Sequence, residues 1–585
     1  MKIASCFSLS LKRCCYLALL LIQLSTSGLI YASPNISITG LTSELEANVR
    51  AYLALSKETC TTPQWKIKRL FNASSQQIEK AVRALGYYHP KIQKTLTWEK
   101  DCWASVFAIQ PGPPVLIKNL DIQILGAGAQ EPFFTKLLAN NSIQIGSIVN
   151  HGDYEALKTS LQVMAEAKGY FDHYYELKRL AINLDTNTAK IQLHLQTGNR
   201  YYISHIDIAK NALDPEFSSQ FLKIEPREAY DREKIVESYQ LLDSSGYYKA
   251  VQLKYLRKQA EDYYAPLAVN LINLPRHVIS AGAGYDTNLG FRLSAEYKNR
   301  YLNKYGHQFN AHLNLSLKKS NFIMEYVLPY NNPLKNRLSF FTAITYENTT
   351  NIDSQKIETG MRLSNRFYGQ LLLSEQLNYV AERFRNSNSA PYKTQFLLVP
   401  GIAISNVRAQ KKGLYLEGYE YSLNLNAAHR SVASSVSFIQ AQFKLKMAYA
   451  TFLGGRIIAR TGLGATSVDV FTDLPSSYRF YAGGDNSVRG YNYKSIGTRD
   501  ASGDVIGGHY LVTGSLEYEQ KIFDNWSMAA FIDAGDAFSS ALKLKFGVGL
   551  GVRWYSIVGP IRLDLASPSN AIGDVHFYIS LSTSL

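Results

Sequence analysis

From about residue 276 to residue 585, apolar and polar side chains alternate in one short segment after another. Alternation with a period of two places the apolar residues on one face of a β-strand. A soluble β-sandwich would alternate in the same way, but would not require so many long, regular strands or so much tyrosine. Units of about 19 residues suit a barrel whose strands cross a membrane in about ten residues, so we expect a 16-stranded antiparallel transmembrane β-barrel. The sixteen segments begin near residues 277, 290, 308, 321, 337, 354, 369, 394, 414, 436, 455, 509, 526, 543, 559 and 575.

The N-terminus has the pattern of a secretory signal peptide. Lys2, Lys12 and Arg13 precede an apolar run over residues 14–22, and Ala32 offers a small residue for cleavage. Such a run is too short to span a bilayer. We therefore expect residues 1–32 to be removed on export, the alternative being an unusual buried helix.

Cleavage near residue 32 leaves two of the five cysteines, Cys60 and Cys102. An exported protein folds in an oxidising compartment, where a pair of cysteines usually forms a disulfide. The sequence thus predicts a Cys60–Cys102 disulfide, and two free buried thiols are the alternative.

Residues 34–275 contain three repeats, which we place at residues 34–112, 113–199 and 200–275. Each repeat carries an amphipathic helix that ends in a glycine, Gly86, Gly169 or Gly246, followed by two aromatic residues. Glycine suits the left-handed position that ends a helix. We expect α+β modules in the order strand, helix, helix, strand, strand, whose open sheet edges offer a place for an extended partner to add a strand. The alternative is that the modules are structural spacers.

The longest connection of the expected barrel runs over residues 468–508. A loop of about 40 residues in a compact domain is usually functional. It contains glycines but no following Lys-Ser/Thr pair, which argues against a phosphate cradle. Ser487 does not lie at a nucleophile elbow, which argues against hydrolase chemistry.

Three short motifs carry a resemblance to a known superfamily. Residues 488–491 are Val-Arg-Gly-Tyr, residues 514–517 are Gly-Ser-Leu-Glu and residues 531–535 are Phe-Ile-Asp-Ala-Gly. They resemble the sixth extracellular loop and two strand motifs of the outer-membrane barrel assembly proteins and two-partner secretion translocators. The repeats then resemble POTRA domains, and three of them with sixteen strands is the layout of the TamA family. The residues that the resemblance assigns to a lock between loop and lumen are Arg489, Gly490, Tyr491, Glu517, Asp533 and Gly535.

Strand parity gives this lock a physical meaning. The outer face of a membrane barrel must be apolar, so Glu517 and Asp533 face the lumen from adjacent strands. Arg489, at the tip of an inward-folded loop, can bridge both carboxylates because its planar fork binds carboxylates bidentately. Gly490 lets the backbone approach the wall closely. The alternative is a solvated arginine on a surface loop.

The seam between the first and last strands is the second candidate site. Gly282 and Gly284 weaken the first strand, because glycine in a strand weakens pairing. The last strand carries an apolar stripe that includes Phe577 and Ile579. We expect Ala283 to lie near Phe577, in a seam that opens sideways to template another strand, ordinary barrel closure being the alternative.

The resemblance implies a non-enzymatic factor, with no catalytic residues, metal or cofactor, in the outer membrane of a Gram-negative bacterium with its POTRA domains in the periplasm. It implies unfolded outer-membrane proteins such as autotransporters as clients, contact with outer-membrane lipid, and a TamB-like partner anchored in the inner membrane. A two-partner-type secretion pore and a passive porin are the alternatives. The net charge of +15 is spread along the chain without basic blocks, so we expect no nucleic-acid partner.

Overall fold

The computed structural model describes residues 33–581, apart from residues 99–101, 368–369, 386–389, 414, 453 and 557–558. The expected signal peptide and the last four residues lie outside the described residues. The chain forms two compact units, one holding the first two modules and the other the third module and the barrel. Within the described parts of the chain, no helix combines the length and apolarity needed to cross a membrane.

Each module has a three-stranded sheet and helices, in the order that the sequence predicts. The sheets have the strand orders β1-β3-β2, β4-β6-β5 and β7-β9-β8, so β2, β5 and β8 are outer strands. The elements are β1 (Asn35–Thr39), α2 (Ser43–Tyr52), η1 (Ala54–Lys57), α3 (Gln64–Ala84), β2 (Lys91–Trp98), β3 (Trp103–Gln110), β4 (Leu116–Leu125), α4 (Pro132–Ala139), α5 (His151–Ala167), β5 (Tyr174–Asn183), β6 (Thr188–Gln196), β7 (Tyr202–Ile208), α6 (Pro215–Ser219), α7 (Arg232–Ser244), β8 (Tyr248–Tyr255), η2 (Arg257–Gln259) and β9 (Tyr264–Asn273).

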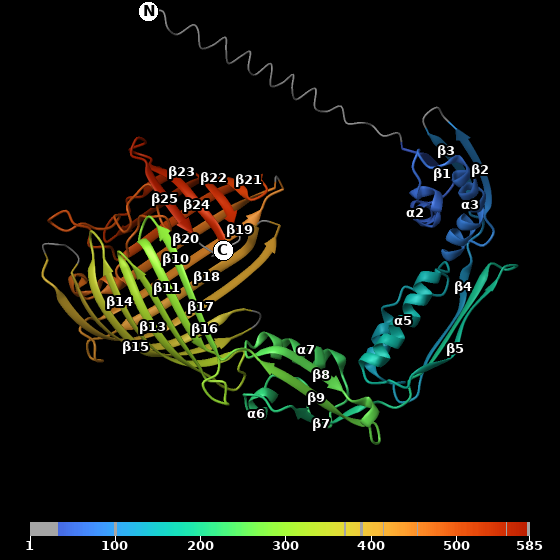
Figure 1. Cartoon of the computed structure of the whole chain (residues 1–585), viewed down its shortest axis with the longest axis horizontal. Helices are drawn as coiled ribbons and strands as arrows, with labels where there is room; N and C mark the ends of the chain where they lie inside the picture. The colour runs from blue at the N-terminus through green and yellow to red at the C-terminus, as the bar shows by residue number, and fades with distance from the viewer. Residues whose placement is uncertain are drawn as a thin grey trace, which may run out of the picture. The chain divides into compact units, whose positions relative to one another are not determined.

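The glycine after each main helix has the conformation that the repeat requires. The φ angles of Gly86, Gly169 and Gly246 are +89°, +89° and +78°, values that side chains with a Cβ rarely adopt. In the second module α5 lies along one face of the sheet (Figure 1), and its Leu161 is buried in one core with Leu193 of β6. Burial of one helix face and one sheet face therefore accounts for the fold of the module.

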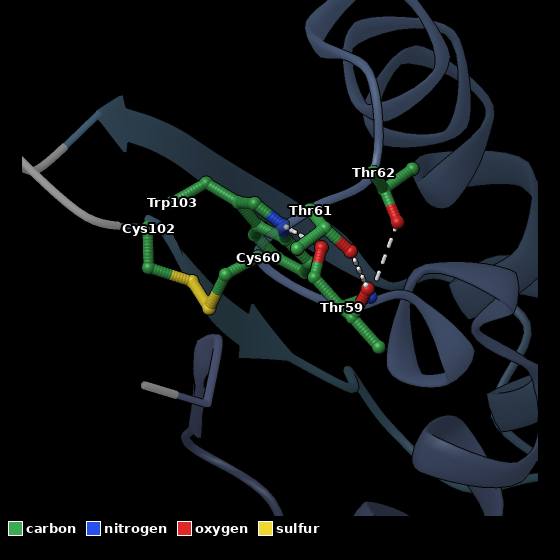
Figure 2. Close-up of a disulfide and its surroundings, with 6 residues drawn as sticks. All are labelled: Thr59, Cys60, Thr61, Thr62, Cys102 and Trp103. Carbon is green, nitrogen blue, oxygen red and sulfur yellow. Dashed lines mark hydrogen bonds between the residues drawn. A yellow bond between two sulfur atoms is a disulfide. The ribbon is translucent and has the colours of Figure 1, made fainter. Parts of the chain in front are cut away.

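Cys60 and Cys102 form a disulfide in the first module (Figure 2). Cys60 lies in the segment before α3, and Cys102 directly precedes β3. The adjacent Trp103 is buried, and its indole N–H donates a hydrogen bond to the Thr59 carbonyl at 3.1 Å. The disulfide and this hydrogen bond tie the same segment to the sheet.

We expect protein isolated from the outer membrane, lacking residues 1–32, to show no free thiol when it is denatured without reductant. Replacing both cysteines by serine should destabilise the first module by about 4 kcal/mol, because the bond closes a loop with a sequence separation of 42 residues. Thiol labelling and urea-dependent proteolysis measure the two effects. Two labelled thiols in the untreated protein would contradict the pairing.

Sixteen antiparallel strands close into a barrel (Figure 1), which confirms the fold class. Apolar residues face outward, as Phe291 and Leu293 illustrate with 72% and 59% exposure, because only lipid-compatible side chains suit that face. The strands are β10 (His277–Asp286), β11 (Gly290–Asn299), β12 (Gln308–Ser316), β13 (Lys319–Pro329), β14 (Asn336–Asn348), β15 (Asp353–Arg366), β16 (Leu372–Arg385), β17 (Lys393–Lys412), β18 (Tyr415–Ala428), β19 (Phe438–Ala450), β20 (Gly455–Val468), β21 (Tyr510–Phe523), β22 (Trp526–Phe538), β23 (Lys545–Ser556), β24 (Gly559–Pro568) and β25 (His576–Leu581).

The third module holds the turn between β11 and β12. The Tyr247 hydroxyl donates to the Gly306 carbonyl at 2.7 Å, and Lys304 forms an ion pair with Asp214 at 3.0 Å. The ring of Phe217 lies so close to Gly306 that a Cβ there would come within 2.3 Å of it. A hydrogen bond, an ion pair and a packing contact therefore join this module to the first strands of the barrel.

Candidate functional site

The loop between β20 and β21 is a folded structure with its own hydrogen bonds. Phe480 pairs with Gly508 and Ala482 with Ile496 in short antiparallel bridges. The buried side chain of Arg479 donates to three backbone carbonyls of the loop, at 2.9–3.1 Å. The loop also contains the short helices η3 (Phe471–Asp473) and η4 (Ser476–Tyr478).

The base of the loop is attached to the barrel wall through Glu382 of β16. This carboxylate is fully buried. It accepts hydrogen bonds from the hydroxyls of Ser476 at 2.6 Å and Ser477 at 2.5 Å, both in the loop. It also accepts one from Ser354 of β15 at 2.9 Å. Glu382 was not predicted as a site residue, because its neighbours Ala381 and Arg383 do not show which face of the strand it occupies.

Arg489 at the tip of the loop binds the two carboxylates that strand parity places in the lumen. Its Nε and Nη2 donate to Asp533 at 2.7 and 2.9 Å, a bidentate pair. Its Nη1 donates to Glu517 at 2.8 Å, and its backbone N–H donates to Asp533 at 3.0 Å. Arg489 is only 2% exposed, so this is a buried charge cluster and not a solvated surface arginine.

Two further residues, which were not predicted, belong to the cluster. Arg553 of β23 donates to Glu517 at 2.7 Å and to Asp564 of β24 at 2.5 Å. Asp564 also accepts from Arg489 at 3.2 Å. Both residues lie between outward-facing apolar neighbours, so the same parity argument that indicates Glu517 and Asp533 would have placed them in the lumen.

The carboxylates of the cluster are buried, and they are paired with arginines. Glu517 and Asp533 are 6% and 0% exposed. Each carboxylate of the cluster is bound by at least one arginine. Buried charges are tolerated when they are paired in this way, and removal of one partner is then strongly destabilising.

Glycines allow the loop tip to dock against the wall. A Cβ on Gly547 of β23 would come within 1.8 Å of the Arg489 carbonyl oxygen. Gly490 has a φ of +91°, and a Cβ there would meet the Ser567 carbonyl carbon at 2.8 Å. Gly535 leaves room for Val488, whose side chain would lie 2.9 Å from a Cβ at that position. The predicted glycines Gly490 and Gly535 thus lie at the docking surface, and Gly547 is an additional one.

We expect Gly547→Ala to displace the loop tip without changing any charge. The new methyl group would overlap a backbone carbonyl, which cannot move away as a flexible side chain can, so docking should weaken by about 3 kcal/mol. Proteinase K sensitivity of the loop in outer-membrane vesicles measures the effect. Gly514→Ala on β21 is the matched control, because a Cβ there meets nothing within 4 Å. Equal loop protection in both variants would contradict the docking geometry.

The loop tip also contacts the two ends of the barrel sheet. The Gly490 N–H donates to the Tyr578 hydroxyl of β25 at 3.0 Å, and that hydroxyl donates to the Tyr491 carbonyl at 2.9 Å. On the other side of the seam, the Asn288 side-chain amide after β10 donates to Asp485 of the loop. Tyr578 was not among the predicted site residues, although its place between Phe577 and Ile579 implied an inward side chain.

The described residues of the seam form few contacts between the first and last strands. Among the described residues, β10 and β25 share one residue pair, Asp286 with Ser580, and the next residues, Thr287 and Ile579, add two hydrogen bonds at 2.9 and 3.3 Å. Gly282 and Gly284 pair with β11. The sequence thus located both strands of the seam.

The expected proximity of Ala283 and Phe577 is wrong. Because the strands are antiparallel, the pairing of Asp286 with Ser580 places Phe577 toward the turn after β10 and Ala283 away from it. Alternation had indicated which face each residue occupies, but a face does not fix the register between two strands. Phe577 points outward and is 49% exposed.

Among the described residues, no group of three or more His, Cys, Asp and Glu side chains is arranged to hold a metal ion. The contacts of Arg489, Arg553 and Tyr578 make the site an ion-paired, hydrogen-bonded lock between a loop, a barrel wall and a seam.

Comparison with known proteins assigns the barrel and the first module. Residues 302–584 match the Omp85 superfamily domain, and residues 35–111 match POTRA domain TamA domain 1. The protein is thus an outer-membrane 16-stranded β-barrel that carries an Omp85 superfamily domain, with N-terminal POTRA domains that lie in the periplasm. More particularly, it combines an Omp85 superfamily domain with a TamA-type POTRA domain. The localisation expected from the sequence is confirmed.

Two relatives illustrate this assignment. The outer membrane protein assembly factor BamA of Nitratidesulfovibrio vulgaris (strain Hildenborough) is 37% identical over 118 residues, which are 19% of this chain and 15% of that protein. The chain therefore matches a small part of the length of this curated relative. The crystal structure of BamA from Haemophilus ducreyi lacking POTRA domains 1–3 has a TM-score of 0.68 at 15% identity, over 80% of this chain and 99% of that one, a likeness of fold.

Proposed function

We propose that this protein is a TamA-type outer-membrane assembly factor that helps to insert β-barrel proteins such as autotransporters. Its role is non-enzymatic. The TamA-type first POTRA domain and the presence of three modules before a 16-stranded barrel support this proposal. The similarity to a BamA assembly factor, although it covers a small part of that protein, supports the same class of function.

The sparse pairing of β10 and β25 within their described residues is the single observation that carries the proposal. The β24–β25 ladder has six residue pairs, whereas the described residues of β10 and β25 share one. Among the described residues, opening the seam breaks few backbone hydrogen bonds and exposes two strand edges. An exposed edge is a template on which an incoming strand can pair, and this is what insertion of a new barrel requires.

The modules are the proposed docking site for the partners. The outer strands β2, β5 and β8 offer edges to unfolded outer-membrane clients and to an elongated, TamB-like partner anchored in the inner membrane. Single photo-crosslinking residues along β5, compared with matched positions on α5, test this placement. Crosslinks from α5 and none from β5 would contradict it.

Deletion of the gene followed by comparison of the outer-membrane proteome tests the function. We expect the levels of several barrel proteins to fall, and the wild-type chain to restore them. A secretion pore of the two-partner type would affect a single exported substrate. A passive porin would conduct steadily in planar bilayers and leave the other barrel proteins unchanged, so either result would contradict the proposal.

A further inference from the structure

A cavity of about 410 Å3 lies in the lumen directly behind the seam. One side is formed by Tyr578 and Ser580 of β25, and the loop tip contributes Asp485 and Asn486. The cavity thus borders both the seam and the loop. Four strands of the barrel line it with basic side chains, namely Arg292, Lys446, Arg460 and Arg562.

The basic residues differ in whether a carboxylate neutralises them. Arg292 forms an ion pair with Asp286 at 3.1 Å. Arg460 donates to Ser515 at 3.0 Å, and the nearest carboxylate recorded for it is Asp533, at 3.9 Å. Within the part of the chain that the structure describes, Lys446 and Arg562 have neither an ion pair nor a side-chain hydrogen bond.

The acidic residues that line the same cavity bind partners other than Lys446 and Arg562. Asp286 binds Arg292, and Asp564 binds both Arg489 and Arg553. Asp485 accepts hydrogen bonds from two asparagine side chains. Among the described residues, none of these carboxylates forms an ion pair with Lys446 or Arg562.

The register of the strands that line the cavity places basic residues directly opposite one another. Lys446 of β19 is directly opposite Arg460 of β20, and Arg562 of β24 is directly opposite Arg553 of β23. Like charges at opposed positions destabilise a sheet. On the neighbouring strand β18, Glu420 is directly opposite Lys446. Among the described residues, however, Glu420 forms no ion pair within 4.0 Å.

We propose that Lys446, Arg460 and Arg562 form an anion-binding site that takes a phosphate group, carried either by a lipid headgroup or by free phosphate. A phosphate presents three oxygens, and guanidinium groups bind such oxygens in a planar, bidentate manner. Bound phosphate would neutralise the repulsion that the register creates. Because β25 forms one wall of the cavity, a headgroup can reach the site from the bilayer when the seam opens.

Equilibrium titration of the full-length protein in an uncharged detergent tests the site. The probes are dihexanoyl phosphatidic acid and inorganic phosphate. We expect Lys446→Gln and Arg562→Gln each to weaken binding at least about tenfold, since a charge-assisted hydrogen bond is lost. Lys411→Gln and Arg408→Gln, which remove the same charges from exposed positions on β17, should bind as the wild type does.

The two probes distinguish the sources of the phosphate. Binding of the lipid at least tenfold tighter than that of inorganic phosphate assigns the site to a headgroup, and equal affinities assign it to free phosphate. Saturable binding by neither probe would overturn the proposal, as would unchanged binding in Arg562→Gln. Heat-modifiability on gels verifies that each variant is folded, and Arg562→Lys, which keeps the charge, should retain part of the affinity. The assay does not depend on assembly activity and is independent of the function proposed above.

Discussion

Arg489→Ala should release the loop tip while the barrel stays closed. The substitution removes both hydrogen bonds that bind Asp533 bidentately and leaves this fully buried carboxylate with Arg460 as its nearest cation, at 3.9 Å. Loss of one partner from a buried pair typically costs about 3–5 kcal/mol. Glu517 keeps Arg553, so we expect the damage to remain local. Digestion of the loop by proteinase K in intact cells measures the release, and heat-modifiability monitors the barrel.

Further variants distinguish a lock from a general loss of charge. Arg489→Lys should rescue loop protection only in part, because one ammonium cannot reproduce the bidentate fork. The double variant Arg489→Ala with Asp533→Ala should be no worse than the worse single variant if the two residues act as a unit. Arg499→Ala is the matched control, since this exposed arginine of the same loop donates to the Gly503 carbonyl and takes no part in the charge cluster. Full loop protection in Arg489→Ala would disprove the lock.

A disulfide between Thr287→Cys and Ile579→Cys should abolish assembly activity. These residues face each other across the seam, where the Ile579 N–H donates to the Thr287 hydroxyl at 2.9 Å. The crosslink should leave the barrel folded, because it joins strands that are already neighbours. Activity should return when reductant is added. The measurement is the level of client barrel proteins in the outer membrane with and without reductant.

A second engineered pair controls for crosslinking as such. Phe340→Cys with Met361→Cys joins β14 to β15 at directly opposed, outward-facing positions far from the seam. We expect this pair to leave activity unchanged. If the seam pair crosslinks completely and activity persists, the strands do not need to separate, and the closed barrel must act in another way.

The sequence predicted the strands and the inward face of the barrel well, because both depend on local alternation. The segments expected near 277, 290 and 308 begin at those residues in the structure. Parity alone placed Glu517 and Asp533 in the lumen. Parity does not say which inward side chains lie at the same height, because height depends on the stagger between strands. For that reason Arg553 and Asp564 were not joined to the cluster, and the Ala283–Phe577 neighbourhood was wrong.

Residues that act through backbone proximity were the hardest to predict. Gly547 has no motif of its own, and its role depends on the Arg489 carbonyl that approaches it from the loop. Tyr578 is one tyrosine among 40, and only its two hydrogen bonds with the loop distinguish it. Both roles arise from contacts between segments that are far apart in the sequence.

The third module is attached to the barrel at the turn between β11 and β12. Tyr247, Asp214 and Phe217 hold a turn that begins one strand away from β10. A displacement of this module would therefore act directly on the β11–β12 turn, next to the first hairpin of the barrel. The opposite edge, β25, is held from within by the loop through Tyr578. The two sides of the β10–β25 seam are thus held differently: the third module contacts the hairpin on the β10 side, and the inward-folded loop contacts β25.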